Sequence, residues 1–292
     1  DEIKLKIDQI MNWNDNDIYC RDLVRRVAHD AYVVSLFAPV EKRPALWAIH
    51  AFNHEIAKIR ETVSEPMLGE IRLQWWSDAI EEICKGTPRQ HQVVQALAHA
   101  YERWGLDREE LQTLIMGRMN DLKNKSFANV ETLFAYIDKT VTPLNRLALK
   151  VLEVPENEKN TLAVSTASLC YGIAGLLRAA PYFFKQNRNF LPVDLMDEAG
   201  LSERTLLSLR PSSELSKIIS RLGEIAFLRL DEVAGIKLSR AAYPAVLSAV
   251  QARWYLMRLK RVNYDPYIYA VSLPIPFHEV RLALKVWSRK WQ

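Results

Sequence analysis

Hydrophobic residues recur at helical spacing along nearly the whole chain, and the alternating patterns typical of strands are almost absent. Proline and glycine lie between the repeats, for example at Pro44, Pro66 and Gly105, where helices commonly begin or end. The pattern predicts helices over 16–37, 42–63, 67–85, 90–104, 107–122, 130–152, 157–180, 213–236, 242–262 and 276–290. Residues 183–210 form the longest stretch predicted to be irregular. We therefore predict a single all-α domain over residues 1–292.

The segment 161–177 carries no charged residue, and Arg178 ends it. Because the segment is rich in serine, threonine and glycine, and a membrane span needs about 20 strongly apolar residues, it favours a buried central helix. Gly172 and Gly175 should let a neighbouring helix approach closely. Pro181 is expected to end this helix.

The stretch AFNHEIAKIRE, residues 51–61, places polar side chains opposite an apolar stripe. His50 and His54 lie one turn apart and could share a metal ion, but Lys58 on the same face would repel it. The HExxH pattern of zinc proteases is absent. We expect a polar face that binds no metal.

Two further groups of charges have an ordinary and a functional interpretation. Asp78, Glu81 and Glu82 could bind magnesium, but neighbouring acids on a helix more often form a solvated face. Arg118 and Asp121 are three residues apart, and alone they predict a surface ion pair.

The net charge of +4 is unevenly distributed. From Arg253 onward there are eight basic and two acidic residues, a net of +6, so the rest carries −2. A cationic end favours an anionic partner such as a lipid surface, a nucleic acid or a diphosphate. Nucleic acid is disfavoured because the basic residues form no stripe interleaved with aromatic side chains.

The segment 276–292 is a basic amphipathic tail. It places Val280, Leu284, Trp287 and Trp291 on one stripe, with basic residues on the other faces. Docking onto the protein's own core is the favoured interpretation, and a membrane interface or a partner protein are the alternatives.

The three cysteines are far apart, which indicates a reducing compartment rather than a disulfide framework. The first ten residues, DEIKLKIDQI, resemble neither a signal peptide nor an organellar transit peptide.

Several segments, taken in order, resemble the squalene/phytoene synthase family over nearly the whole chain. They are YCRDLVRRVAHDAYVVSLFAP (19–39), RPALWAIHAFN (43–53), IRLQWW (71–76), LIMGRMNDL (114–122), FAYIDKTVTPL (134–144), YGIAGLLR with NRNFLP (171–192) and YPAVLSAVQARWYLMRLKRVNYDPY (243–267). The resemblance implies an isoprenoid-synthase-type helical bundle around a central apolar cavity. It also implies two aspartate-rich motifs whose carboxylates hold Mg²⁺ against the diphosphate of a prenyl substrate.

Neither motif is intact. Where the resemblance implies DDxxD, residues 57–61 read AKIRE, so only Glu61 keeps a carboxylate and Lys58 brings a positive charge. The two aspartates expected after Arg178 are Ala179 and Phe183. We therefore expect no metal and no cofactor, and Mg²⁺ only if the protein is active after all.

The resemblance also extends to Arg178, Arg188, Asp121 and Tyr136, which match family positions associated with the pocket. The full set of ligand-binding candidates is Arg43, His54, Lys58, Arg178, Lys185 and Arg188. If the protein is an active enzyme, the catalytic candidates are Glu61, Asp121 and Tyr136. The charges of Lys185 and Arg188 could hold a diphosphate together with Arg178, or could be ordinary loop charges.

The chain further resembles a branch of the family that is poor in metal motifs and occurs in alphaproteobacteria and mitochondria. That resemblance implies support for the assembly of respiratory complex I by a catalytically degenerate protein, with a protein partner and a prenyl or lipid ligand. In a eukaryote the location would be the matrix side of the mitochondrial inner membrane, with peripheral membrane contact through 276–292. In a bacterium it would be the cytoplasm. The rival hypothesis is an active Mg²⁺-dependent head-to-head prenyltransferase of isoprenoid biosynthesis.

Overall fold

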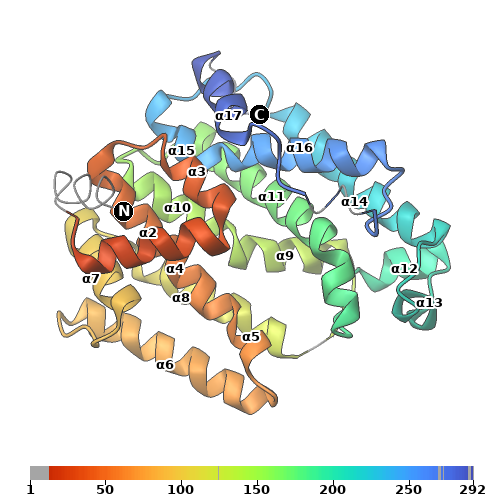
Figure 1. Cartoon of the computed structure of the whole chain (residues 1–292), viewed down its shortest axis with the longest axis horizontal. Helices are drawn as coiled ribbons and strands as arrows, with labels where there is room; N and C mark the ends of the chain where they lie inside the picture. Colours follow the sequence, from red (N-terminus) through yellow and green to blue (C-terminus); the bar gives the residue numbers. More distant parts are fainter. Residues whose placement is uncertain (1–12, 124, 269–270, 272, 289–290, 292) are drawn as a thin grey trace. The chain divides into compact units, whose positions relative to one another are not determined.

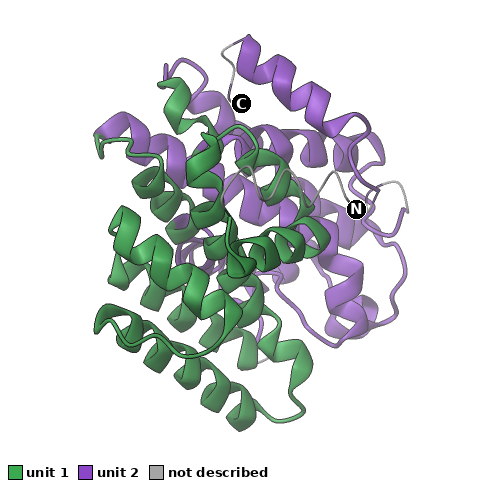
Figure 2. Ribbon diagram, turned by 60° about the vertical axis from the view of Figure 1, so that its left-hand side comes forward, with its two compact units in different colours: residues 1–122, 143–157, 239–245 green, residues 123–142, 158–238, 246–292 purple. Residues whose placement is uncertain are grey.

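The computed structural model describes residues 13–123, 125–268, 271, 273–288 and 291. Within these residues all regular structure is helical and no strand is present (Figure 1). The chain divides into two compact units (Figure 2). Unit 1 comprises residues 1–122, 143–157 and 239–245, and unit 2 comprises 123–142, 158–238 and 246–292. The all-α prediction is confirmed.

Unit 1 is built around a helix with an apolar side and a polar side. Its elements are α2 (Asp15–Val27), α3 (His29–Ser35), η1 (Val40–Lys42), α4 (Arg43–Ala57), α5 (Ile59–Thr62), α6 (Pro66–Cys84), α7 (Gln92–Trp104), α8 (Arg108–Leu122), η2 (Arg240–Ala242) and most of α10 (Thr142–Val151) and α15 (Tyr243–Val246). Helix α4 packs against α2, α3, α7 and α8. It buries Trp47 and Phe52, and the Trp47 indole N–H donates to the Ser35 hydroxyl at 2.8 Å. This packing fixes the direction in which the polar side of α4 faces.

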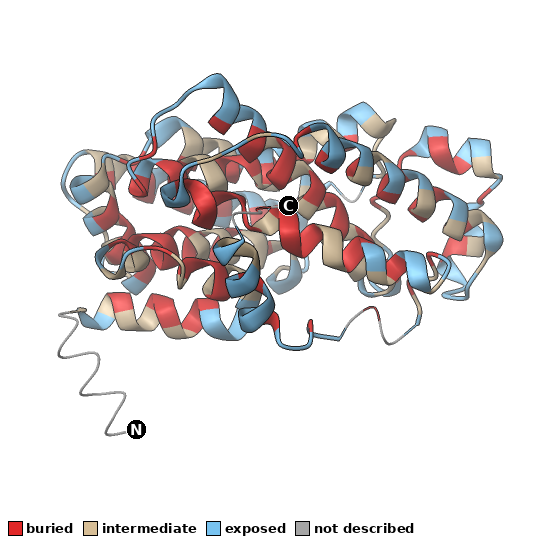
Figure 3. Cartoon of the chain, turned by 90° about the horizontal axis from the view of Figure 1, so that it is seen from above, coloured by how far each residue is buried: buried red, intermediate tan, exposed pale blue. Residues whose placement is uncertain are grey.

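Unit 2 surrounds a single long helix. Its elements are α9 (Val130–Thr140), α11 (Glu158–Lys185), α12 (Val193–Ala199), α13 (Glu203–Leu207), α14 (Ser213–Glu232), α16 (Ser248–Arg261) and α17 (His278–Trp287). Helix α11 packs against α9, α13, α14 and α16. Among the described helices it is the one long and apolar enough to cross a membrane, yet 56% of its most apolar 18-residue stretch is buried. Figure 3 shows that helices of this protein carry both buried and exposed residues. It is the core helix of unit 2, as predicted.

Helix boundaries depart from the prediction where packing or proline geometry overrides periodicity. The helix predicted over 16–37 breaks at Ala28, whose ψ of 54° is not helical, and α3 then brings Ser35 to Trp47. The helix predicted over 130–152 breaks at Val141, because Pro143 has no N–H to continue it.

The segment predicted to be irregular contains the end of α11 and all of α12 and α13. Pro181 lies inside α11 and does not end it. An interior proline costs a helix about 3 kcal/mol. In the turn after Pro181 the Phe184 ring is fully buried and stacks on Phe190, with 5.7 Å between the ring centroids, and this burial contributes favourably to the end of α11. The Ser202 hydroxyl caps α13 by accepting from the Thr205 N–H at 3.1 Å.

Gly172 and Gly175 differ in what surrounds them. A Cβ on Gly172 would overlap the Ile137 side chain of α9, so the predicted close approach is confirmed there. A Cβ on Gly175 would have no atom within 4 Å, so the prediction is wrong for that residue.

We expect Gly172→Ala to lower the free energy of unfolding by about 1–2 kcal/mol, because overpacking costs more than the gain in helix propensity. Gly175→Ala, on the same helix, is the matched control and should raise the free energy of unfolding by up to about 1 kcal/mol. Urea unfolding of the two variants measures both changes. Equal effects would contradict the close packing of α9 on α11.

Candidate functional site

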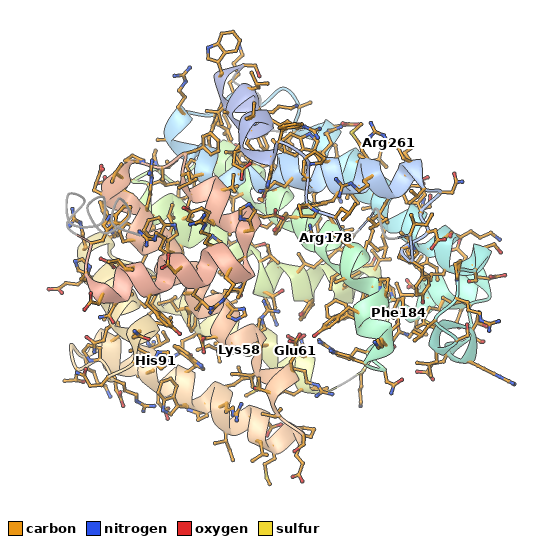
Figure 4. All side chains as sticks on the ribbon, viewed as in Figure 1. Lys58, Glu61, His91, Arg178, Phe184 and Arg261 are labelled. Carbon is orange, nitrogen blue, oxygen red and sulfur yellow. The ribbon has the colours of Figure 1, made fainter. Side chains whose placement is uncertain are left out.

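The polar side of α4 passes into α5, where the chain resembles the first metal motif (Figure 4). Lys58 ends α4, and its ammonium lies 2.6 Å from the Glu55 carboxylate. The Glu55 side chain is only 11% exposed, against 38% for Lys58. Glu61 follows on α5 and is exposed. In the stretch 57–61 that resembles a metal clamp, Lys58 therefore forms an ion pair with Glu55, which lies three residues earlier in the chain.

The two histidines of α4 have an environment that disfavours positive charge. Burial lowers the pKa of His50 from 6.5 to about 4, so its imidazole is neutral at pH 7. Burial also lowers the pKa of His54, and the nearby Lys58 lowers it further. Among the described residues no group of three or more histidine, cysteine or acidic side chains is arranged to hold a metal ion.

Magnesium prefers an octahedral set of oxygen ligands, usually carboxylates, water and substrate phosphate. In unit 1 the stretch 57–61 offers Glu61 alone, beside the Lys58 ammonium. In unit 2, Ala179 and Phe183 on α11 carry no side-chain oxygen. The residues at these two positions do not fit the metal clamps that the resemblance implies.

Asp121 lies in unit 1 and is held within the protein rather than on its surface. The Arg118 guanidinium on α8 lies 3.4 Å from the Asp121 carboxylate and donates to the Asn53 side chain on α4 at 3.0 Å. The side chains of Arg118 and Asp121 are 13% and 11% exposed. The predicted surface ion pair is therefore wrong: the pair is mostly buried because Arg118 extends across to α4.

Arg43, in the first turn of α4, forms hydrogen bonds to the protein backbone. Its guanidinium donates to the Ala38 carbonyl at 3.0 Å and to the Leu36 carbonyl at 2.8 Å, and burial lowers its pKa. These bonds hold the segment that leads from α3 into α4.

Asp78, Glu81 and Glu82 of α6 accept hydrogen bonds from other side chains, and for Glu81 and Glu82 these are ion pairs. Arg108 donates to Glu81 at 2.6 Å, Arg89 donates to Glu82 at 2.6 Å, and the Gln74 side chain donates to Asp78 at 2.8 Å. These hydrogen bonds hold the pKa of Glu81 and of Glu82 below the usual range. The structure thus agrees with the solvated-face interpretation.

Unit 2 brings cations and aromatic rings together near Arg178, in the C-terminal third of α11. The Arg178 guanidinium stacks over the Tyr255 ring of α16 at 3.9 Å, and the Arg281 guanidinium of α17 stacks over Trp254 at 4.5 Å. Burial lowers the pKa of Arg258, and the positive charges of Arg178, Arg281 and Arg261 lower it further. Tyr255 and Arg258 are about one turn apart on α16, so the Arg178 guanidinium over Tyr255 lies near Arg258. Guanidinium groups of this kind suit phosphate or carboxylate ligands.

The other candidate residues of unit 2 make contacts of their own. Lys185 is exposed at the end of α11, and the Arg188 guanidinium stacks over Phe183 at 4.7 Å. The Tyr136 ring on α9 contacts Phe127 at 5.2 Å.

The sequence prediction did not identify Tyr255, the ring on which Arg178 stacks, or the cations Arg258 and Arg281 as parts of this site. The excess of positive charge from Arg253 onward was a signal for it. Charge alone did not indicate which of these residues approach Arg178.

The all-helical fold is that of an isoprenoid-synthase-like protein, here with substituted residues at the metal positions. The squalene/phytoene synthase family model matches residues 24–288, and the chain belongs to that family. The structure of a dehydrosqualene synthase in complex with ligand superposes with a TM-score of 0.80 at 14% identity, covering 96% of this chain and 98% of the other. This likeness confirms the isoprenoid-synthase fold.

Two curated relatives carry different functional names. NADH dehydrogenase (ubiquinone) complex I, assembly factor 6, of Rattus norvegicus is 27% identical over 279 residues, which cover 95% of this chain and 84% of the relative. Phytoene synthase 1, chloroplastic, of Arabidopsis thaliana is 23% identical, covering 87% of this chain and 66% of the relative. The chain is thus similar both to an assembly factor and to an enzyme of one family.

Proposed function

We propose that this protein supports the assembly of respiratory complex I and does not couple prenyl diphosphates. The observation that carries the proposal is the Lys58–Glu55 ion pair where the family resemblance implies a magnesium clamp. The Lys58 ammonium opposes the binding of Mg²⁺ at this position, and its pairing with Glu55 at 2.6 Å occupies a carboxylate that could otherwise serve as a ligand. The similarity to complex I assembly factor 6 over 95% of this chain supports the assembly role.

A retained scaffold can bind a ligand without turning it over. Arg178 and Arg258 offer guanidinium groups that could bind an anionic head group without metal. A prenyl or lipid ligand, with its apolar chain in the predicted cavity, is the class that we propose.

The partner is a protein of the respiratory complex during its assembly. In a eukaryote we place the protein on the matrix side of the mitochondrial inner membrane, and in a bacterium in the cytoplasm. The segment 276–292 would give peripheral contact with the membrane. The buried or half-buried thiols of Cys20, Cys84 and Cys170 are free, which suits these reducing compartments.

The second candidate function is an active prenyltransferase, which the similarity to phytoene synthase favours. It requires Glu61, Asp121 and Tyr136 to replace the usual motifs. Arg118 already neutralises Asp121 in unit 1, which weakens this candidate.

The test combines a genetic and a biochemical measurement. In the organism that carries this chain, deletion of its gene should reduce assembled complex I and its NADH–ubiquinone activity, while succinate dehydrogenase activity stays unchanged. Unaltered complex I would overturn the assembly role.

The purified protein should release no diphosphate from farnesyl or geranylgeranyl diphosphate, with or without Mg²⁺. Magnesium-dependent release of diphosphate together with a lipid product would establish the enzyme instead. Glu61→Gln would then be expected to abolish that turnover.

A further inference from the structure

Helix α17 exposes a stripe of large apolar side chains. Phe277 and Trp287 are each 79% exposed, Val280 is 59% exposed and Leu284 is 58% exposed. Val280, Leu284 and Trp287 are spaced by four and three residues, which places them on one face of the helix, and Phe277 directly precedes the helix with a left-handed backbone. We name these four residues the outer stripe. Contiguous exposed apolar side chains of this size indicate a surface that contacts another apolar phase.

The opposite face of α17 docks onto unit 2. Leu282 is fully buried, and His278 is buried with its ring nitrogen 3.1 Å from the Gln251 side chain of α16. The His278 ring also contacts Trp254 at 5.9 Å. Docking onto the core was therefore the wrong prediction for Val280, Leu284 and Trp287, because a different face of the helix makes the contact.

Both ends of α17 are anchored as well. The Arg258 guanidinium donates to the Leu273 and Pro274 carbonyls in the segment that precedes the helix. Beyond the helix, Trp291 is buried, and its indole N–H donates to the Ile236 carbonyl at 2.9 Å. The prediction of docking is confirmed for Trp291. A helix held at its inner face and at both ends presents the outer stripe in a fixed direction.

Positive charge lies along one edge of the outer stripe. Arg281 and Lys285 are one turn apart on α17 and follow the stripe residues Val280 and Leu284. The acid of this helix, Glu279, lies on the other side of the stripe, near the docked face. Arg289 and Lys290 lie outside the described residues. The charge complements an anionic surface, and aromatic residues at both ends of the stripe suit a lipid–water interface.

We infer that the outer stripe of α17 is a membrane-docking surface that inserts into the interface of a bilayer containing anionic phospholipids. The helix lies parallel to the bilayer plane, with the outer stripe among the acyl chains and with Arg281 and Lys285 at the phosphate level. This inference rests on the membrane contact proposed above and specifies its face and its lipid class.

Vesicle sedimentation with the full-length protein tests the surface. The protein should bind phosphatidylcholine vesicles that contain phosphatidylglycerol more tightly than vesicles of phosphatidylcholine alone. Leu284→Ser/Trp287→Ser should weaken binding about 100-fold, since two large apolar side chains no longer leave water. Arg281→Gln/Lys285→Gln should weaken binding to the anionic vesicles about 30-fold and leave binding to neutral vesicles unchanged.

The matched control is Met116→Ser/Leu228→Ser, which removes apolar side chains that are 60% and 64% exposed on α8 and α14. This control should bind vesicles like the unmodified protein. Absence of vesicle binding by the unmodified protein, or equal binding by the outer-stripe variant, would overturn the inference. Equal binding to neutral and anionic vesicles would overturn its lipid class.

The amount of assembled complex I is measured separately in cells. If the outer-stripe variant restores complex I to the deletion strain although it has lost vesicle binding, the assembly role stands without the membrane contact. If the variant has lost vesicle binding and deletion of the gene leaves complex I intact, the assembly role fails and the docking surface stands.

Discussion

Replacing Arg118 with alanine is expected to lower the free energy of unfolding by about 3 kcal/mol, the lower end of the cost of breaking a buried ion pair. The change removes the cation beside Asp121, and it removes the hydrogen bond from Arg118 on α8 to Asn53 on α4. Arg118→Lys should lose less, because an ammonium keeps the charge but cannot reach in both directions as a guanidinium does. Urea unfolding at pH 7 measures both variants.

A matched ion pair provides the control. Arg229 and Glu232 on α14 have the same spacing and lie 3.1 Å apart, but their side chains are 53% and 60% exposed. Arg229→Ala should therefore cost less than about 1 kcal/mol. A double-mutant cycle of Arg118→Ala with Asp121→Ala should give a coupling energy between about 0.5 and 3 kcal/mol. Equal losses for Arg118→Ala and Arg229→Ala would show that burial does not distinguish the two pairs.

This experiment also bears on function, because Asp121 is a catalytic candidate under the enzyme hypothesis. If Asp121 serves only to pair with Arg118, Asp121→Asn changes the free energy of unfolding and no activity is lost. If Asp121 holds magnesium, Asp121→Asn abolishes prenyl turnover in a protein that remains folded.

Periodicity predicted the helices well and their interruptions less well. The buried core helix over 161–177 was identified because an apolar run without charge has few other places in a folded chain. The continuation of α11 through Pro181 was not predictable from the same rule. The stacking of Phe184 on Phe190 that accompanies it joins two residues with no periodic relation.

Predictions for the sites succeeded where the chemistry is local. Lys58 was recognised as opposed to metal binding because its charge and its spacing from His54 can be read from one helix. The stacking of Arg178 on Tyr255 joins α11 to α16, and no local pattern specifies it. Similarly, the spacing of Val280, Leu284 and Trp287 predicted a stripe but not the direction that it faces. Docking inward and exposure outward produce the same periodicity, and the buried Leu282 and His278 decide between them.

Acidification is expected to destabilise the protein through His50. The pKa of His50 is lowered from 6.5 to about 4 by burial, so between these two values the unfolded chain binds a proton that the native protein does not. The contribution of His50 to the free energy of unfolding is complete above pH 6.5 and is lost as the pH falls toward 4. The whole shift corresponds to about 3 kcal/mol. Roughly 2 kcal/mol of it should be lost between pH 7.5 and pH 5.

Comparison with His50→Gln isolates this residue, because glutamine does not titrate. Urea unfolding of the two proteins should give curves of stability against pH that run parallel above pH 7.5 and converge as the pH falls, with the unmodified protein losing more. The readout is the difference in slope, so a uniform loss of stability in the variant does not affect the result. Parallel curves down to pH 5 would contradict the lowered pKa, and His50 would then have to be accessible to protons in the native protein.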